Sequence, residues 1–170
     1  KSDVILFTGD IVNTHATEMH QWTEMFKGIY NPKFGKYSVL GNHDYGEYID
    51  WPTQKAKDEN FEAIKGLHQQ IDFKLLLNEH VKLKNGSDEI AIVGVENWGH
   101  NFKKVGDLNK ASDGLSVNDF KILMSHDPSH WEYEVKNNQK HFHLTLSGHT
   151  HGMQFGIEIP GIIKWSPVQY

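Results

Sequence analysis

The tetrapeptide Gly41-Asn42-His43-Asp44 brings an amide, an imidazole and a carboxylate together in immediate succession. It follows an apolar run at residues 37–40 and precedes the pair Tyr45-Gly46, which is typical of a turn. A buried strand that ends in this way delivers polar side chains to the rim of a sheet. By itself the tetrapeptide also fits a turn with a helix cap, so its interpretation depends on the rest of the chain.

Three more apolar runs end in polar clusters of the same kind. Gly9-Asp10 follows residues 4–7, His126-Asp127 follows residues 121–124, and Gly148-His149-Thr150-His151 follows residues 143–146. Taken singly, Asp10 fits a turn residue, His126 fits a rim histidine, and a His-x-His pair is a weak metal signal. Functional sites in open α/β sheets gather at the carboxyl ends of strands, so we expect the four clusters to converge on one rim.

The converging side chains offer oxygen and nitrogen ligands. One carboxylate, one amide oxygen and three or four imidazoles suit Mn, Fe or Zn, and the absence of cysteine excludes thiolate ligands. In an extended loop His149 and His151 point the same way and can ligate adjacent ions. Asp10 has two oxygens and can bridge such a pair. Two ions about 3.5–4 Å apart can share a hydroxide and hold a phosphoryl group during in-line displacement.

Composition narrows the function classes. The 170 residues suit one domain with a core, and we find no domain boundary or internal repeat. Nucleic-acid-binding proteins usually have a basic face, and the net charge of -5 gives no reason to expect one, so no nucleic-acid partner is expected. All 17 basic residues are lysine, so phosphate binding must rely on metals, lysine, histidine or backbone N–H groups. No apolar run approaches the roughly 18 residues of a membrane span, which leaves the localisation open between the cytoplasm and a membrane periphery.

The apolar patterns predict an α/β fold. Continuous runs predict buried strands at residues 4–7, 37–40, 73–77, 121–124 and 143–146. Residues 80–84 and 89–95 flank Asn85-Gly86 and predict a hairpin, and residues 153–163 predict two strands around Pro160-Gly161. Amphipathic spacing predicts helices at residues 19–29 and 61–71, with short ones at 107–111 and 131–135. Seven histidines outside the clusters are expected on exposed surfaces or helix faces: His15, His20, His68, His80, His100, His130 and His141.

Together the motifs resemble the signature of the calcineurin-like metallophosphoesterases. That family pattern reads Asp-x-His, Gly-Asp, Gly-Asn-His-Asp/Glu, His and Gly-His-x-His, and all but its first part match, from Gly9 to Gly152. The run from Leu144 to Gln154 is also similar to the bacterial membrane-associated branch, which includes lipid A-pathway-like phosphodiesterases. The resemblance implies a four-layer sandwich of two mixed β-sheets flanked by helices, formed by residues 1–170 as a single, partial domain.

The resemblance also implies a role for each matching residue. Asp10 bridges two metal ions, Asn42, His126 and His149 complete one metal site, and His151 ligates the other ion. His43 acts as general acid at the leaving group, and Asp44 orients and charges it. The implied reaction is hydrolysis of a phosphomonoester, phosphodiester or pyrophosphate bond by attack of a metal-bridging hydroxide.

The first family motif, Asp-x-His, is absent from this chain. It would end a strand before Val4, so we expect a sheet that is incomplete at its first strand and a chain trimmed at both ends. Two ligands of the His151 site would be missing with that motif. We therefore expect two divalent ions (Mn, Fe or Zn) in a complete protein, one well-held ion in this chain, and impaired turnover by this chain alone.

The substrate is predicted only as a class. Residues 96–100 and the group Tyr45, Tyr48 and Trp51 follow strand ends and could either wall the site or pack as ordinary loops. Aromatic walls would suit a phosphorylated small molecule, a nucleotide conjugate or a glycolipid, the last in a membrane-associated protein. The main alternative is a metal-binding scaffold of the same fold without catalysis, which the intact His43 disfavours. A zinc hydrolase of unrelated type is disfavoured because no His-x-His-x-Asp-His cluster occurs.

Overall fold

A computed structural model describes residues 1–100, 103–151 and 157–165 of the chain. Its first sheet contains three parallel strands in the order β1 (Ile5–Phe7), β2 (Lys36–Ser38) and β3 (Lys74–Leu75). β1 pairs with β2 from Ile5↔Lys36 to Phe7↔Ser38, and β3 pairs with the other side of β2. Among the described residues β1 therefore forms one edge of this sheet.

The second sheet is mixed and has the order β4 (Glu79–Asn85), β5 (Asp88–Gly94), β6 (Phe120–Met124) and β7 (Leu144–Leu146). β4 and β5 form the predicted hairpin, in which Asn85 pairs with Asp88 across Gly86-Ser87. Gly86 has a φ of 63°, the positive value that such a turn requires. β5, β6 and β7 run parallel, so β6 and β7 end on the same side.

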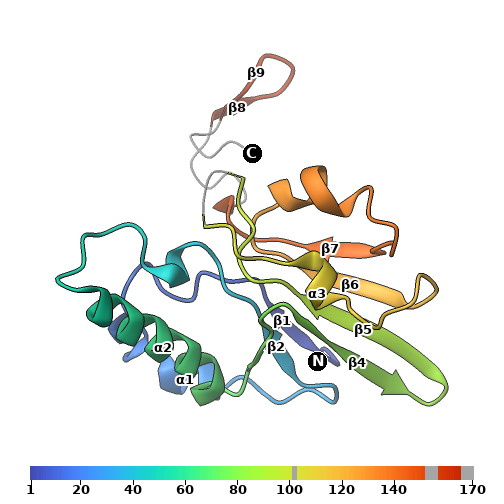
Figure 1. The fold of residues 1–170 in the computed structure, drawn as a ribbon, viewed down its shortest axis with the longest axis horizontal. Coiled ribbons are helices and arrows are strands. Elements are labelled where there is room, and N and C mark those ends of the chain that lie inside the picture. Colours follow the sequence, from blue (N-terminus) through green and yellow to red (C-terminus); the bar gives the residue numbers. More distant parts are fainter. Residues whose placement is uncertain (101–102, 152–156, 166–170) are drawn as a thin grey trace.

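Helices cover the outer face of each sheet (Figure 1). α2 (Gln54–Gln70) begins at Thr53, whose side chain accepts a hydrogen bond from the backbone N–H of Ala56. With α2, the short helices η1 (Ala16–Met19) and α1 (Thr23–Lys27) lie beside the first sheet. α3 (Leu108–Ala111) and the π-helical turn η3 (Trp131–Val135) lie beside the second.

Three buried clusters hold these four layers together. Ile64 and Leu67 of α2 pack with Leu40 and Phe73 outside the first sheet, and Val93 and Leu123 pack with α3 outside the second. Between the sheets, the buried side chains are Val39, Leu76, Ile92 and Met124. Neighbouring residues of β5 and β6 thus bury opposite faces, which is why these strands are continuously apolar. The predicted α/β sandwich is confirmed, with one difference: the described strands of the first sheet are all parallel.

Two local predictions differ from the structure. The helix predicted over residues 19–29 is divided into η1 and α1, because Trp22 N–H bonds to Met19 O and Thr23 Oγ1 caps the same carbonyl. His130 is fully buried, although it was expected on a surface or a helix face, whereas His68 lies on the buried face of α2. His68 packs beside Phe7, and His130 stacks on Trp98.

The C-terminal part contains the hairpin β8 (Ile157–Ile159) and β9 (Ile163–Trp165), as predicted around Pro160-Gly161. The predicted strand residues 153–156, together with Gly152 of the last motif, lie outside the described residues. None of the helices in the described part of the chain has both the length and the apolar character needed to cross a bilayer.

Candidate functional site

The polar residues that follow β1, β2, β6 and β7 meet at one place. Asp10 Oδ2 lies 3.0 Å from His126 Nε2, and Asn42 Oδ1 lies 3.1 Å from the same nitrogen. His149 Nδ1 lies 2.8 Å from Asn42 Oδ1. Residues from four strand ends, far apart in sequence, therefore form one group, which we call the ligand cluster (Asp10, Asn42, His126 and His149).

The hydrogen bonds around the ligand cluster fix which atoms face inward. His126 Nδ1 lies 2.7 Å from Thr8 O, and since a carbonyl only accepts, this nitrogen carries the proton and Nε2 points into the cluster. Asn42 Nδ2 donates to Tyr48 Oη at 2.5 Å, which turns Oδ1 toward the two histidines. In the neutral ring, His126 Nε2 therefore presents a lone pair to two oxygen acceptors.

Such a convergence of acceptors is stable only with a cation among them. Without a metal a proton takes this role. Burial lowers the pKa of His126, but the hydrogen bond and charge of Asp10, the hydrogen bond to Thr8 O and the charge of Asp44 together outweigh burial and hold this pKa above its ordinary value. Burial likewise raises the pKa of Asp10, whereas His126 and the N–H of His43 bring it below the usual range. The cluster thus has the electrostatic character of a cation site.

The spacing of the ligand cluster also fits a metal ion. The carboxylate and imidazole ligand atoms of Asp10, His126 and His149 all lie within 4.8 Å of one another. Neighbouring ligands of an octahedral ion bonded at about 2.1 Å lie about 3 Å apart, which matches the 2.8–3.1 Å separations in the cluster. The hydrogen bond that orients His126 from behind is typical of metal-ligating histidines. The residues present therefore fit a divalent ion with mixed N and O ligands.

Two glycines and two strained residues permit this close approach. A Cβ on Gly41 would lie 2.2 Å from Asp10 Oδ1, and one on Gly9 would lie 2.6 Å from the backbone N of Gly41. Asp10 itself has a φ of 59° and His149 a φ of 66°, in the left-handed region that L-residues rarely adopt. Of the six such non-glycine residues in the described part, three are predicted ligands, the third being His151. Backbone strain of this kind is characteristic of functional sites.

The carboxylate of Asp44 has backbone hydrogen-bond partners, which the sequence did not predict. Its buried carboxylate accepts hydrogen bonds from the backbone N–H groups of Gly41, Asp10 and Ile11 at 2.8–3.0 Å, and so joins the loops after β1 and β2. The imidazole of His43 is held by the main-chain carbonyl of Asn13. Burial raises the pKa of Asp44 to about 6, helped by the charge of Asp10 and opposed by the N–H of Gly41. Asp44 therefore positions the loop that carries the ligands rather than the imidazole of His43.

His43 begins the short helix η2 (His43–Tyr45) at the edge of the ligand cluster. Its Nδ1 lies 2.8 Å from Asn13 O, so this nitrogen carries a proton and Nε2 is left for other partners. The ring stacks on Tyr48 with centroids 4.5 Å apart, and the backbone N–H donates to Asp10 Oδ1 at 3.0 Å. These three contacts orient an imidazole beside the cluster without making it a member.

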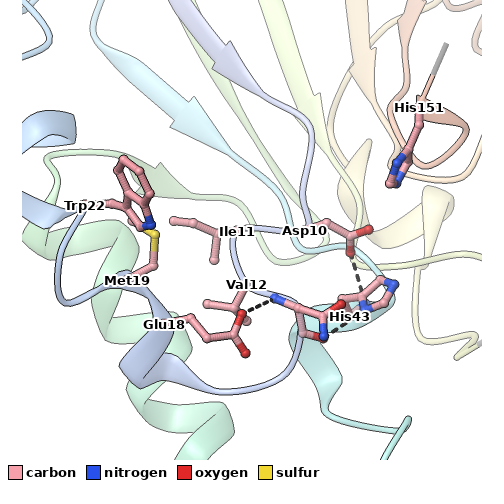
Figure 2. A pocket seen from close by; sticks show the side chains of 9 residues that line it. Asp10, Ile11, Val12, Glu18, Met19, Trp22, His43 and His151 are labelled. Atoms are coloured by element: carbon pink, nitrogen blue, oxygen red, sulfur yellow. Dashed lines mark hydrogen bonds between the residues drawn. The ribbon is translucent and has the colours of Figure 1, made fainter. Parts of the chain in front are cut away.

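His151 is brought near the site but does not join the ligand cluster. It is exposed and lines a pocket that Asp10 and His43 also line (Figure 2). Within the described residues, the group that could hold an ion consists of Asp10, His126 and His149 without His151. The second metal site predicted around His151 therefore has one further described ligand, Asp10.

The predicted aromatic walls are mostly core residues. Trp98 is 2% exposed and stacks on His130, and Tyr45 is 7% exposed and bonds to Glu96. Tyr48 alone lies against the site, where it contacts both Asn42 and His43. Tyr48 was predicted as part of an aromatic wall, but its hydrogen bond with Asn42 was not predicted. The bond between His43 and the carbonyl of Asn13 was not predicted either, because every residue type has such a carbonyl.

Comparison with known proteins agrees with this geometry. The family model for calcineurin-like phosphoesterases matches residues 1–153. The chain is 33% identical to the uncharacterized metallophosphoesterase YkuE of Bacillus subtilis over 98% of its length and 53% of that protein. It is 25% identical to YkoQ of the same organism, covering 89% of this chain and 51% of YkoQ.

A third relative carries a more specific name. The chain is 27% identical to the UDP-2,3-diacylglucosamine pyrophosphatase LpxG of Chlamydia muridarum, covering 93% of this chain and 56% of that protein. The chain spans about half the length of these curated relatives. With the family model covering nearly the whole chain and the ligand cluster in place, the chain belongs to the calcineurin-like phosphoesterase family.

Proposed function

We propose that this chain carries the catalytic centre of a metal-dependent phosphoesterase, which hydrolyses a phosphomonoester, phosphodiester or pyrophosphate bond. The observation that supports this most directly is the ligand cluster, whose inward-facing acceptors lie about 3 Å apart beside an oriented imidazole. Asp10, Asn42, His126 and His149 would hold the ion. When bound, a divalent ion neutralises phosphoryl charge and lowers the pKa of coordinated water.

His43 supplies the proton for the departing oxygen in this proposal. Its Nδ1 proton is committed to Asn13 O, so proton transfer must take place at Nε2 of the imidazolium. The stack on Tyr48 and the N–H bond to Asp10 hold the ring at a fixed place relative to the ligand cluster. Such positioning lets the acid act on the leaving oxygen without a search through rotamers.

We further propose that one ion is held well and a second one weakly. The well-held ion has four ligands in the cluster, whereas a second ion would have Asp10 and His151 among the described residues. Mn, Fe and Zn all fit the nitrogen and oxygen ligands. Millimolar metal would fill the weaker site by mass action, so turnover should rise with Mn²⁺ concentration beyond the point where the first site is full.

The substrate would be a phosphorylated small molecule, a nucleotide conjugate or a glycolipid. The name of the relative LpxG, a UDP-2,3-diacylglucosamine pyrophosphatase, shows that one member of the family acts on a pyrophosphate bond in a molecule with both nucleotide and acyl groups. That name supports the class of substrate proposed for this chain.

The test is a phosphodiesterase assay in millimolar Mn²⁺ with two substrates that differ in the leaving group. We expect His43→Ala to retain the metal and to lose about 10²–10⁴-fold in rate with an alkyl ester, and much less with bis(p-nitrophenyl) phosphate. A nitrophenolate leaves without help from an acid. His20→Ala, which alters an exposed histidine, is the matched control.

Equal losses on both substrates would remove the general-acid role of His43. A chain that binds Mn²⁺ in the ligand cluster but hydrolyses neither substrate at any Mn²⁺ concentration would favour the non-catalytic scaffold instead.

A further inference from the structure

The pocket beside His43 has two chemically different ends. It encloses about 320 Å³, near the lower limit for ligand sites. One end is formed by Asp10, His43 and His151, and the other by Ile11, Met19 and Trp22. Figure 2 shows the two groups on opposite sides, and we call this space the side pocket. Its size suits one phosphoryl group and a short chain or a single ring.

The position of the side pocket relates it to one half of the substrate. A group that donates a proton to the departing oxygen must lie beside the leaving group, and His43 lines the side pocket. Asp10 lines it as well and also belongs to the ligand cluster, so the pocket starts where the phosphoryl group would be held. The half of the substrate that enters the side pocket is therefore the half released on cleavage.

The far end of the side pocket is an apolar wall with an open aromatic ring. Met19 is 3% exposed and Ile11 is 9% exposed, and both are fixed in the core that packs against α2. Trp22 is 47% exposed and projects from the segment between η1 and α1. An apolar group bound against Met19 and the half-exposed indole of Trp22 would be stabilised, because apolar surface is removed from water.

A fixed negative charge borders the same pocket. The carboxylate of Glu18 accepts hydrogen bonds from the backbone N–H groups of Asn13, Thr14 and His15 at 2.7–2.9 Å. Slight burial raises the pKa of Glu18, but the three N–H bonds together lower it below the usual range. This carboxylate is held ionised on the pocket rim and repels a second anion.

We propose that the side pocket receives the leaving group of the phosphoester and selects one that is uncharged and apolar along its first few carbon atoms. This inference rests on the proposed function and adds the substrate class to it. A leaving group that carries its own phosphate or carboxylate within the pocket is disfavoured by Glu18, which narrows the proposed bond classes to phosphomonoesters and phosphodiesters. The wall of Trp22 and Met19 favours an alkyl chain or a ring over a strongly hydrated sugar.

Binding of alkylphosphonates in Mn²⁺ tests the proposal without turnover. In these compounds a P–C bond replaces the P–O bond to the leaving group, so the chain stays attached. By isothermal titration calorimetry we expect hexylphosphonate to bind about tenfold more tightly than methylphosphonate. We expect ω-carboxypentylphosphonate, whose chain is of similar length but ends in a carboxylate, to bind no more tightly than methylphosphonate.

Variants locate the preference. Trp22→Ala should reduce the hexyl-to-methyl ratio of affinities to less than about threefold. Trp131→Ala is the matched control, because Trp131 is 44% exposed and lies outside the side pocket, and it should leave the ratio unchanged. Glu18→Gln should bring the affinity of the ω-carboxypentyl compound closer to that of the hexyl compound. Circular dichroism of each variant checks the fold.

The outcomes separate the two proposals. Equal affinities for hexylphosphonate and methylphosphonate, or a ratio that Trp22→Ala leaves intact, would overturn the assignment of the side pocket. A Trp22-dependent preference in a chain that hydrolyses no phosphoester would overturn the proposed function and keep the apolar pocket. Failure of all three phosphonates to bind in Mn²⁺ would overturn the assignment of the side pocket, and the phosphodiesterase assay alone decides the proposed function.

Discussion

The surroundings of His126 and His151 differ although both residues were predicted metal ligands. His126 is 1% exposed, and its ring is held between Thr8 O, Asp10 and Asn42. His151 is exposed and lines the pocket beside Asp10, the other predicted ligand that lines it. Among the described residues, the group that could hold an ion thus includes His126 and not His151.

This difference separates two conditions for a metal site. Backbone strain is present in both places, since His149 has a φ of 66° and His151 a φ of 54°. In the ligand cluster, hydrogen bonds turn the ligand atoms inward: His126 Nδ1–H donates to Thr8 O, and Asn42 Nδ2–H donates to Tyr48 Oη. A strong site needs ligands whose orientation is already determined before the ion arrives.

Asp10 is common to both sites, and its substitution should give the largest effect. Asp10→Asn retains the shape and the acceptor for His43 N–H but removes a charge from the ligand set. We expect the rate of phosphoester hydrolysis to fall by more than about 10³-fold and Mn²⁺ affinity to fall with it. Calorimetry and the two-substrate assay measure both quantities. Retention of metal affinity would place the ion elsewhere.

Asn42→Ala removes a ligand of the tightly bound ion, and His151→Ala removes a ligand of the weaker site. Loss of the Asn42 amide should weaken the tightly bound Mn²⁺ by at least about 100-fold, because the cluster loses a ligand and its link to Tyr48. His151→Ala should change the affinity of that ion by less than about twofold. Similar losses in the two variants would mean that the sites are not distinct.

Acid pH would weaken metal binding and the fold together, and His68 allows the two to be separated. Burial lowers the pKa of His68 from 6.5 to about 4, and neither ring nitrogen has a hydrogen-bond partner among the described residues. The unfolded chain therefore takes up the proton first. The folded state therefore loses stability as the pH falls from about 6.5 toward 4. The loss in the free energy of unfolding is about 2 kcal/mol at pH 5.

His68→Phe should remove this acid sensitivity, because a neutral ring fits beside Phe7 at any pH. Urea unfolding of the wild type and the variant at pH 7 and pH 5 measures the effect, with His20→Gln as an exposed control. Parallel loss of stability in wild type and His68→Phe would contradict it. Metal affinity of the variant at pH 5 then reports the ligand cluster alone.

Tyr48→Phe should give the smallest effect. It retains the stack on His43 and removes the hydroxyl that accepts from Asn42 Nδ2. Loss of one hydrogen bond of about 1 kcal/mol corresponds to about a fivefold weaker affinity for Mn²⁺. Tyr133→Phe, at an exposed tyrosine outside the cluster, should have no effect. An unchanged affinity in Tyr48→Phe would mean that the amide of Asn42 is oriented without Tyr48.

The strands and the convergence of the polar residues that follow them could be predicted, because local patterns encode them. Apolar runs ending in Gly9-Asp10 or Gly41-Asn42 mark the end of a buried strand, and parallel pairing of neighbouring strands in each sheet brings these ends together. The role of Asp44 could not be predicted, because its partners are backbone N–H groups of a distant loop, which leave no mark in the sequence.

Burial of single polar and aromatic residues was also beyond the sequence. His130 and Trp98 are buried against each other in a stack, and the residues next to them in the sequence do not indicate this contact. Likewise, the acceptor that orients His43 is a main-chain carbonyl, which every residue type provides. Such contacts depend on where the loops lie after the sheets have packed.

The number of Mn²⁺ ions that the chain holds tightly at neutral pH tests the proposed metal site in the ligand cluster most directly. Equilibrium dialysis followed by gel filtration and metal analysis measures this number. The geometry of the ligand cluster predicts one ion per chain, retained in His151→Ala and lost in Asn42→Ala. Two tightly held ions, or none, would contradict it.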